Sequence, residues 1–68
     1  MGGWNYYQGT ILDYNKAIEI NPTEGKYYFR RGLAKIKSGQ TDSGCLDLNK
    51  AKELGYEKAA DEIKNDCK

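Results

Sequence analysis

Hydrophobic residues recur at helical spacing along most of the chain, between short polar or glycine-containing breaks. In the first segment, four side chains spaced by four, three and four positions share one face of a helix: Tyr7, Ile11, Tyr14 and Ile18. The last segment carries a similar stripe, at Tyr56, Ala59, Ala60, Ile63 and Cys67. No segment shows the strict alternation that is typical of a β-strand. The pattern therefore predicts an all-α protein.

The breaks divide the chain into four expected helices, at about residues 7–20, 24–38, 41–54 and 57–67. Asn21-Pro22 ends the first, because the residue before a proline is disfavoured in helical conformation. The connections between the helices are only a few residues long. We therefore expect consecutive helices to pack as antiparallel hairpins.

Polar and glycine residues at these breaks suggest how the helices begin and end. Thr23 and Thr41 are candidate N-caps of the second and third helices, since a threonine hydroxyl can accept a bond from a free backbone N–H. Gly39 and Gly55 follow the second and third helices, where glycine readily adopts the left-handed conformation of a C-terminal cap.

The stretch from Tyr14 to Gly32 resembles the junction between two tetratricopeptide repeats. Its pattern is an aromatic residue, an alanine, a proline corner, a second aromatic residue and a glycine, here Tyr14, Ala17, Pro22, Tyr28 and Gly32. These five residues fall at the family's offsets within its period of about 34 residues. The resemblance implies a fold of helical hairpins stacked as an α-α superhelix.

One complete repeat can be aligned, with its large and small packing positions at Tyr28, Gly32, Gly44, Leu48 and Ala51. Glycine inside a helix costs about 1 kcal/mol relative to alanine, so these two glycines indicate helices that approach closely. The resemblance implies an organisation into a lead at 1–5, the second helix of a truncated repeat at 6–22, a full repeat at 23–55 and a C-terminal capping helix at 56–68.

The chain departs from the family pattern at two places in this repeat. Arg31 stands where a core leucine is common, which weakens one expected core contact, although its aliphatic stem can still cover apolar surface. Gly55-Tyr56 replaces the proline corner that would lead into another repeat. We interpret the second departure as the end of an array.

The resemblance also implies a binding surface. In tetratricopeptide arrays the first helix of each repeat lines a concave groove, and the residues on that face here are Lys26, Phe29, Arg30, Leu33 and Lys37. Among the aromatic residues, only Phe29 is predicted on this open face. Lys26 and Arg30 match two basic positions of the clamp with which some family members grip a terminal carboxylate. The alternative is a solvated helix face, which is the more common role of such pairs.

The first helix suggests a second mode of association. Its partner helix within a repeat would precede it, so we expect its aromatic and aliphatic residues to be exposed or covered by another chain. The candidate self-association residues are Trp4, Tyr7, Ile11 and Ile18. A homodimer formed by exchange of helices is the resulting alternative.

Two interpretations of the two cysteines stay open. If the third and fourth helices form a hairpin, Cys45 and Cys67 lie level with each other, at a rise of about 1.5 Å per residue on either side of the turn. A disulfide would add about 3 kcal/mol by the chain-entropy estimate. The other interpretation is two reduced, buried thiols. A disulfide would indicate an extracytoplasmic protein, and free thiols a cytoplasmic one.

Composition and charge limit the remaining functions. The 68 residues allow one domain, and a net charge of +1 gives no electrostatic footprint for nucleic acid or anionic membrane. With no apolar run long enough to span a bilayer, we expect a soluble segment. The chain has no histidine, no paired CxxC and no phosphate-binding loop. We therefore expect no metal, no cofactor and no enzymatic activity, and favour a module that binds a protein or peptide.

Overall fold

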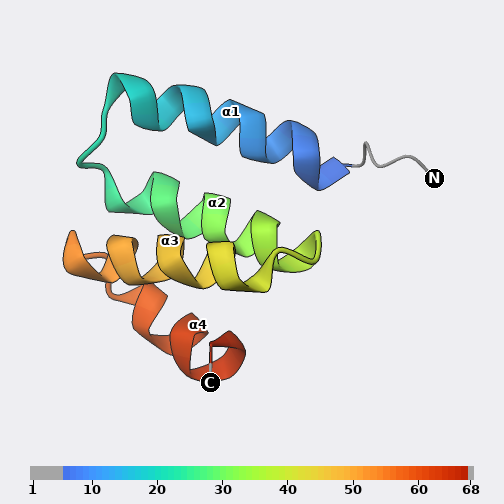
Figure 1. The fold of residues 1–68 in the computed structure, drawn as a ribbon. Coiled ribbons are helices and arrows are strands. Elements are labelled where there is room, and N and C mark those ends of the chain that lie inside the picture. Colours follow the sequence, from blue (N-terminus) through green and yellow to red (C-terminus); the bar gives the residue numbers. More distant parts are fainter. Residues whose placement is uncertain (1–5, 68) are drawn as a thin grey trace.

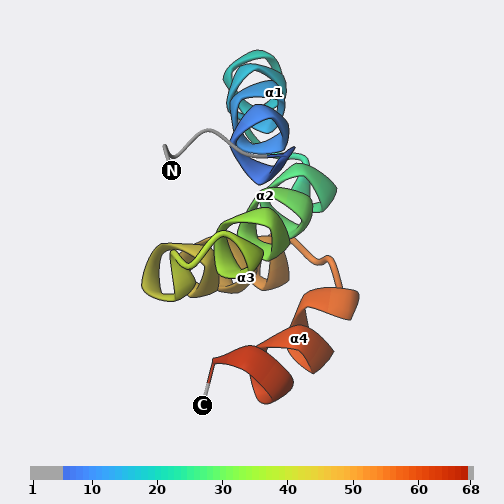
Figure 2. The same ribbon diagram turned by 90° about the vertical axis from the view of Figure 1, so that its right-hand side faces the viewer.

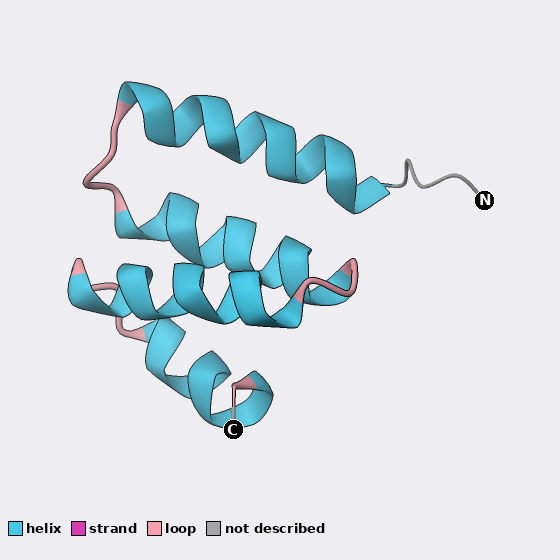
Figure 3. Cartoon of the chain, viewed as in Figure 1, coloured by secondary structure: helices cyan, strands magenta, loops and turns pink. Residues whose placement is uncertain are grey.

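The computed structural model describes residues 6–67, which form four α-helices joined by short loops (Figure 1). The helices are α1 (Tyr6–Ile20), α2 (Gly25–Lys37), α3 (Thr41–Glu53) and α4 (Lys58–Asp66). Every bound lies within one residue of its prediction, and the described residues contain no strand (Figure 3). The predicted all-α class is confirmed. The predicted lead at 1–5 lies outside the described residues.

The proline corner between α1 and α2 is held by backbone and side-chain bonds. The N–H of Asn21 donates to the carbonyl of Ala17 at 2.9 Å. Across the corner, the hydroxyl of Tyr28 donates to the carbonyl of Pro22 at 3.1 Å. An aromatic residue and a proline of the repeat pattern therefore contact each other directly.

For α2 and α3, the predicted C-terminal caps are confirmed, whereas the predicted N-caps are not. Gly39 and Gly55 have positive φ angles of 95° and 92°, as expected for left-handed caps. The prediction of threonine N-caps is wrong, because Glu24 and Gln40 occupy those positions and neither makes a side-chain capping bond. Thr41 is instead the first helical residue of α3.

The helices form a thin stack, 36 × 30 × 14 Å in its principal extents, in which α2 and α3 are the central hairpin. Viewed end-on in Figure 2, α1 lies beside α2, whereas α3 has α2 on one side and α4 on the other. The main core lies among the last three helices and contains Phe29, Leu48, Ala51 and Ala59. Half-buried side chains surround it: Tyr28, Leu33, Ile36, Tyr56, Ile63 and Cys67.

Two glycines bring α2 and α3 into close contact. A Cβ atom on Gly32 would lie 2.7 Å from the carbonyl oxygen of Gly44. A Cβ atom on Gly44 would lie 2.6 Å from the carbonyl oxygen of Gly32. No side chain fits at either position without moving the helices apart, so the predicted close approach is confirmed.

A buried carboxylate joins the same two helices. Asp47 of α3, only 6% exposed, accepts from Nε and Nη2 of Arg31, both at 2.8 Å. Nζ of Lys35 lies 3.1 Å from the same carboxylate. Arg31 also donates from Nη1 to the side-chain oxygen of Asn15 in α1 at 2.9 Å. Hydrogen bonding to Asp47 raises the pKa of Arg31. The arginine predicted as a weakened core contact therefore links three helices.

Candidate interaction surfaces

A groove with a volume of about 220 Å³ runs between α1 and α2. Helix α1 supplies aromatic side chains and a hydroxyl, and α2 supplies aliphatic side chains and two cations. The lining residues of this α1–α2 groove are Tyr6, Tyr7, Thr10, Tyr14, Arg30, Leu33, Ala34 and Lys37. Its volume lies below the range of about 300 to 1,000 Å³ that is typical of small-molecule pockets, and its lining mixes aromatic, aliphatic and charged side chains.

Three of the five residues predicted to bind a partner line this groove. Arg30 and Lys37 are exposed at its edge, and Leu33 is half-buried within it. Lys26 is exposed but is not part of the lining. The structure therefore brings Arg30 to the groove together with Lys37, and not with Lys26.

The prediction that Phe29 lies on the open face is wrong. Its side chain is only 9% exposed, and its ring centroid is 4.9 Å from that of Tyr56. The segment after α3 carries Tyr56 and Ala59 over this face of α2, and both residues pack in the same core as Phe29. Phe29 stabilises the fold and is not available to a partner.

The residues predicted for self-association also lie elsewhere than expected. Ile11 is 7% exposed, and Tyr7 and Ile18 are half-buried. Because the main packing partner of α1 is α2, this stripe faces α2 and not an absent helix. The prediction of an exposed Ile11 is therefore wrong. Trp4 lies outside the described residues.

A different stripe of α1 lies beside the one that packs on α2, and its members Tyr6 and Thr10 also line the α1–α2 groove. Its members are spaced by four, three, four and three positions, which places them on one side of the helix. We call this stripe the α1 open face, and it consists of Tyr6, Thr10, Asp13, Ala17 and Ile20. Tyr6 and Ile20 are 80% and 79% exposed. The apolar pattern did not predict this face, because the neighbouring stripe with larger apolar residues was expected to be the exposed one.

A repeat in the sequence relates this face of α1 to a largely buried stripe along α3. The segment 12–19 reads LDYNKAIE and the segment 46–53 reads LDLNKAKE, so six of eight residues recur 34 residues apart. The same offset relates the α1 open face to a stripe that runs along α3 from its N-cap to its C-cap, namely Gln40, Gly44, Asp47, Ala51 and Leu54. Three of these α3 residues, Gly44, Asp47 and Ala51, are buried. Helix α2 packs against this stripe of α3.

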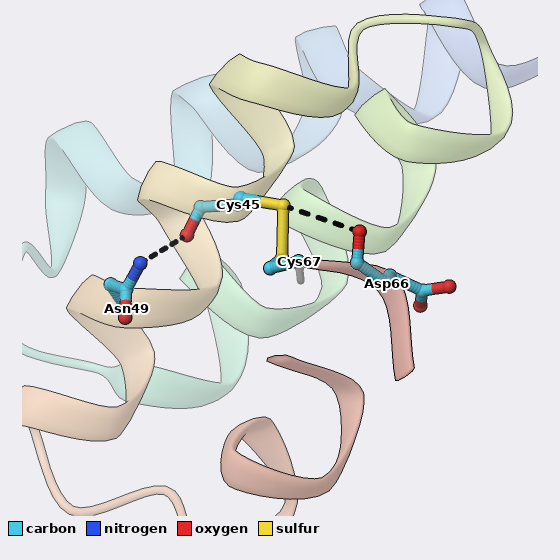
Figure 4. The surroundings of a disulfide bond; sticks show 4 residues. All are labelled: Cys45, Asn49, Asp66 and Cys67. Carbon is cyan, nitrogen blue, oxygen red and sulfur yellow. Dashed lines mark hydrogen bonds between the residues drawn. A yellow bond between two sulfur atoms is a disulfide. The ribbon is translucent and has the colours of Figure 1, made fainter. Parts of the chain in front are cut away.

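A disulfide joins Cys45 of α3 to Cys67 at the end of α4, with their Cα atoms 5.8 Å apart (Figure 4). The N–H of Cys67 donates to the carbonyl of Ile63 at 2.9 Å. Cys67 therefore continues the backbone hydrogen bonding of α4. Cys45 Sγ lies 3.8 Å from the carbonyl oxygen of Asp66. Of the two interpretations of the cysteines, the structure contains the bridged one.

Comparison of the chain with models of protein families, with curated proteins and with solved structures finds no match. Within residues 6–67, no helix combines the length and the apolar character needed to cross a membrane.

Proposed function

We propose that this chain is a non-enzymatic protein-interaction module of the tetratricopeptide kind, which binds a peptide segment of a partner in the α1–α2 groove. The observation that carries the proposal is the groove itself, with aromatic side chains on one wall and cations at its edge. The recurrence of LDxNKAxE after 34 residues supports the repeat assignment, since the family has a period of about 34 residues. In this assignment α2 and α3 form the full repeat, and α4 is the capping helix.

The lining of the groove defines the chemistry of such a peptide. It contains two cations, Arg30 and Lys37, and no carboxylate. Arg30 makes no hydrogen bond or ion pair with any other residue of the described chain, whereas Lys37 lies near Glu62. We therefore expect the peptide to place an acidic group near Arg30 and an apolar side chain against Leu33 and the tyrosine rings.

Selection from a displayed library of random peptides on the disulfide-bonded chain tests this function. Selected peptides should bind the double variant Arg30→Ala, Lys37→Ala about tenfold more weakly, since each exposed ion pair contributes up to about 1 kcal/mol. The matched control is Lys52→Ala, Lys64→Ala, which removes the same charge from α3 and α4. Equal affinities for the two double variants, or no selected peptide, would contradict the proposal.

Self-association is the second candidate function, and one observation favours it. Helix α1 exposes three large apolar side chains, Tyr6, Leu12 and Ile20. Sedimentation over a range of concentrations would detect a dimer, and the variant Leu12→Asp, Ile20→Asp should abolish it. A monomer at the highest concentration reached would exclude this candidate. Ile11→Asp is unsuitable as a test because Ile11 is buried against α2.

A further inference from the structure

The packing of α2 on α3 shows which residues of a helix contact the repeated segment 46–53. Helix α2 presents Gly32 where the backbones meet. Next to the glycine, Arg31 forms a two-bond contact with Asp47, and Lys35, one turn further, reaches the same carboxylate. The recognised pattern is therefore an arginine, an adjacent glycine and a lysine four positions after the arginine, all on one side of a helix.

The equivalent surface of α1 has no such helix in the described chain. Asp13 stands 34 residues before Asp47 in the recurring LDxNKAxE segment. It is exposed, and it makes no hydrogen bond or ion pair with any residue from 6 to 67. Tyr6 and Ile20, at the two ends of the same face, are the most exposed large apolar side chains that the structure describes. Helix α1 packs mainly against α2, whereas α3 packs against both α2 and α4 (Figure 2).

We propose that the α1 open face binds an amphipathic helix of a partner protein, whose arginine and lysine, four positions apart, pair with Asp13 as Arg31 and Lys35 pair with Asp47. This inference rests on the proposed interaction function and adds to it a second ligand, a basic helix on α1, distinct from the acidic peptide expected in the α1–α2 groove. The bound helix would run antiparallel to α1 and cover the side of the α1–α2 groove that contains Thr10 and Tyr14.

Charge complementarity selects a basic helix over an acidic one, and competition within the chain disfavours a second copy. A carboxylate at the centre of an apolar stripe favours a basic helix and disfavours an acidic one. In a second copy of this chain, the helix with the required pattern is α2, but its arginine is already bound to Asp47. A separate partner helix is free of that competition.

The α1 open face and the equivalent stripe of α3 differ at two positions, and this difference affects which helix can bind. Thr10 stands at the position of Gly44, and Tyr14 at that of Leu48. Because Gly44 leaves no room even for a Cβ atom, a helix over Thr10 must lie further from α1 than α2 lies from α3. A small residue next to the partner's arginine keeps this separation short enough for the arginine to reach Asp13.

The test uses a fluorescent synthetic peptide with the sequence of residues 23–38, which carries the required pattern. Its binding to the disulfide-bonded chain is measured by fluorescence anisotropy. Asp13→Ala should weaken binding about tenfold, because a hydrogen bond to a charged group contributes about 1.5 kcal/mol or more. Asp42→Ala, which removes an exposed carboxylate of α3, is the matched control and should leave binding unchanged. A peptide with Arg31→Asp should bind the Asp13→Arg chain better than it binds the original chain.

Each other result overturns the inference in a recognisable way. Binding that is equal for Asp13→Ala and the original chain excludes the proposed pairing, and absence of peptide binding excludes the helix site. Neither result decides the proposed function, which is tested separately by the library-selected peptides and their dependence on Arg30 and Lys37. A dimer of the chain alone that dissociates on Asp13→Ala would identify a second copy, and not a partner helix, as the occupant.

Discussion

Two aspartates at equivalent positions have opposite environments in this molecule. Asp47 is enclosed between α2 and α3 and binds two cations, whereas Asp13 is exposed on α1. We expect Asp47→Ala to lower the free energy of unfolding by about 2 to 3 kcal/mol, because it leaves Arg31 and Lys35 largely buried without their anion. The matched variant Asp13→Ala should change it by less than about 0.5 kcal/mol. Chemical denaturation of both variants measures the difference, and equal effects would contradict this account of the network.

The glycines allow a second comparison between buried and open positions. Gly44→Ala should destabilise the protein by about 1 to 3 kcal/mol, since the new Cβ atom would lie 2.6 Å from the backbone of α2. At Gly9 of α1, the corresponding Cβ position has no atom within 4 Å beyond its chain neighbours and the backbone of its own helix. Gly9→Ala should therefore stabilise the protein by up to about 1 kcal/mol through helix propensity alone. A melting temperature of Gly44→Ala equal to or above that of the original chain would exclude close packing as the role of Gly44.

At the scale of the helix, α4 is attached to the rest of the protein by little buried apolar surface and by a disulfide. Ala59 is its single buried residue in the described chain, and the Cys45–Cys67 disulfide fixes its far end. Reduction should lower the free energy of unfolding by about 3 kcal/mol. Hydrogen exchange should accelerate first in α4. The variant Cys45→Ser, Cys67→Ser is the control, and its stability should be insensitive to reductant. Unchanged exchange in reduced α4 would show that packing alone holds this helix.

Helix α4 also carries an unfavourable pair of carboxylates. Hydrogen bonding with Asp66, one turn further along, raises the pKa of Glu62 above its ordinary value of 4.5, and burial and the charge of Asp66 act in the same direction. The folded state therefore binds this proton more tightly than the unfolded state. The resulting stabilisation is complete below the ordinary pKa and is lost as the pH rises through the raised pKa.

Replacement of Glu62 tests this pH dependence. Glu62→Gln should be more stable than the original chain at pH 7, by about 0.2 to 0.5 kcal/mol, the usual effect of like charges at this spacing. At pH 4 the two proteins should be nearly equal. Thermal unfolding at both pH values provides the measurement. A variant that is less stable than the original chain at pH 7 would mean that the attraction of Glu62 to Lys37 outweighs its repulsion from Asp66.

At the scale of the molecule, stability is distributed along a stack in which each helix contacts mainly its neighbours. The core lies among α2, α3 and α4, whereas α1 contributes Ile11 as its single buried residue in the described chain. We expect backbone amides of α1 to exchange faster than those of α2 and α3, as in other stacked helices with few non-local contacts. Hydrogen exchange followed by NMR measures this order. Uniform protection of α1 and α3 would indicate that the whole chain unfolds as one unit.

Much of the local structure could be predicted from the sequence. The apolar spacing, Pro22, Gly39 and Gly55 placed the four helices, because they act through the backbone of a few neighbouring residues. The threonine caps were predicted wrongly, because a residue one position away can occupy the cap without any side-chain bond. The site was predicted only in part: Arg30, Leu33 and Lys37 line the groove, but Phe29 does not.

The sequence by itself determined which segments are helical, where they turn and that Gly32 and Gly44 face a close neighbour, since these properties follow from local spacing and backbone freedom. Only the tertiary structure decided which of two stripes on α1 faces α2, that α4 covers Phe29, and that Asp47 is enclosed while Asp13 is not. The physical reason is that burial depends on what packs against a helix. Two nearly identical segments, 12–19 and 46–53, therefore differ in burial because of the helices around them.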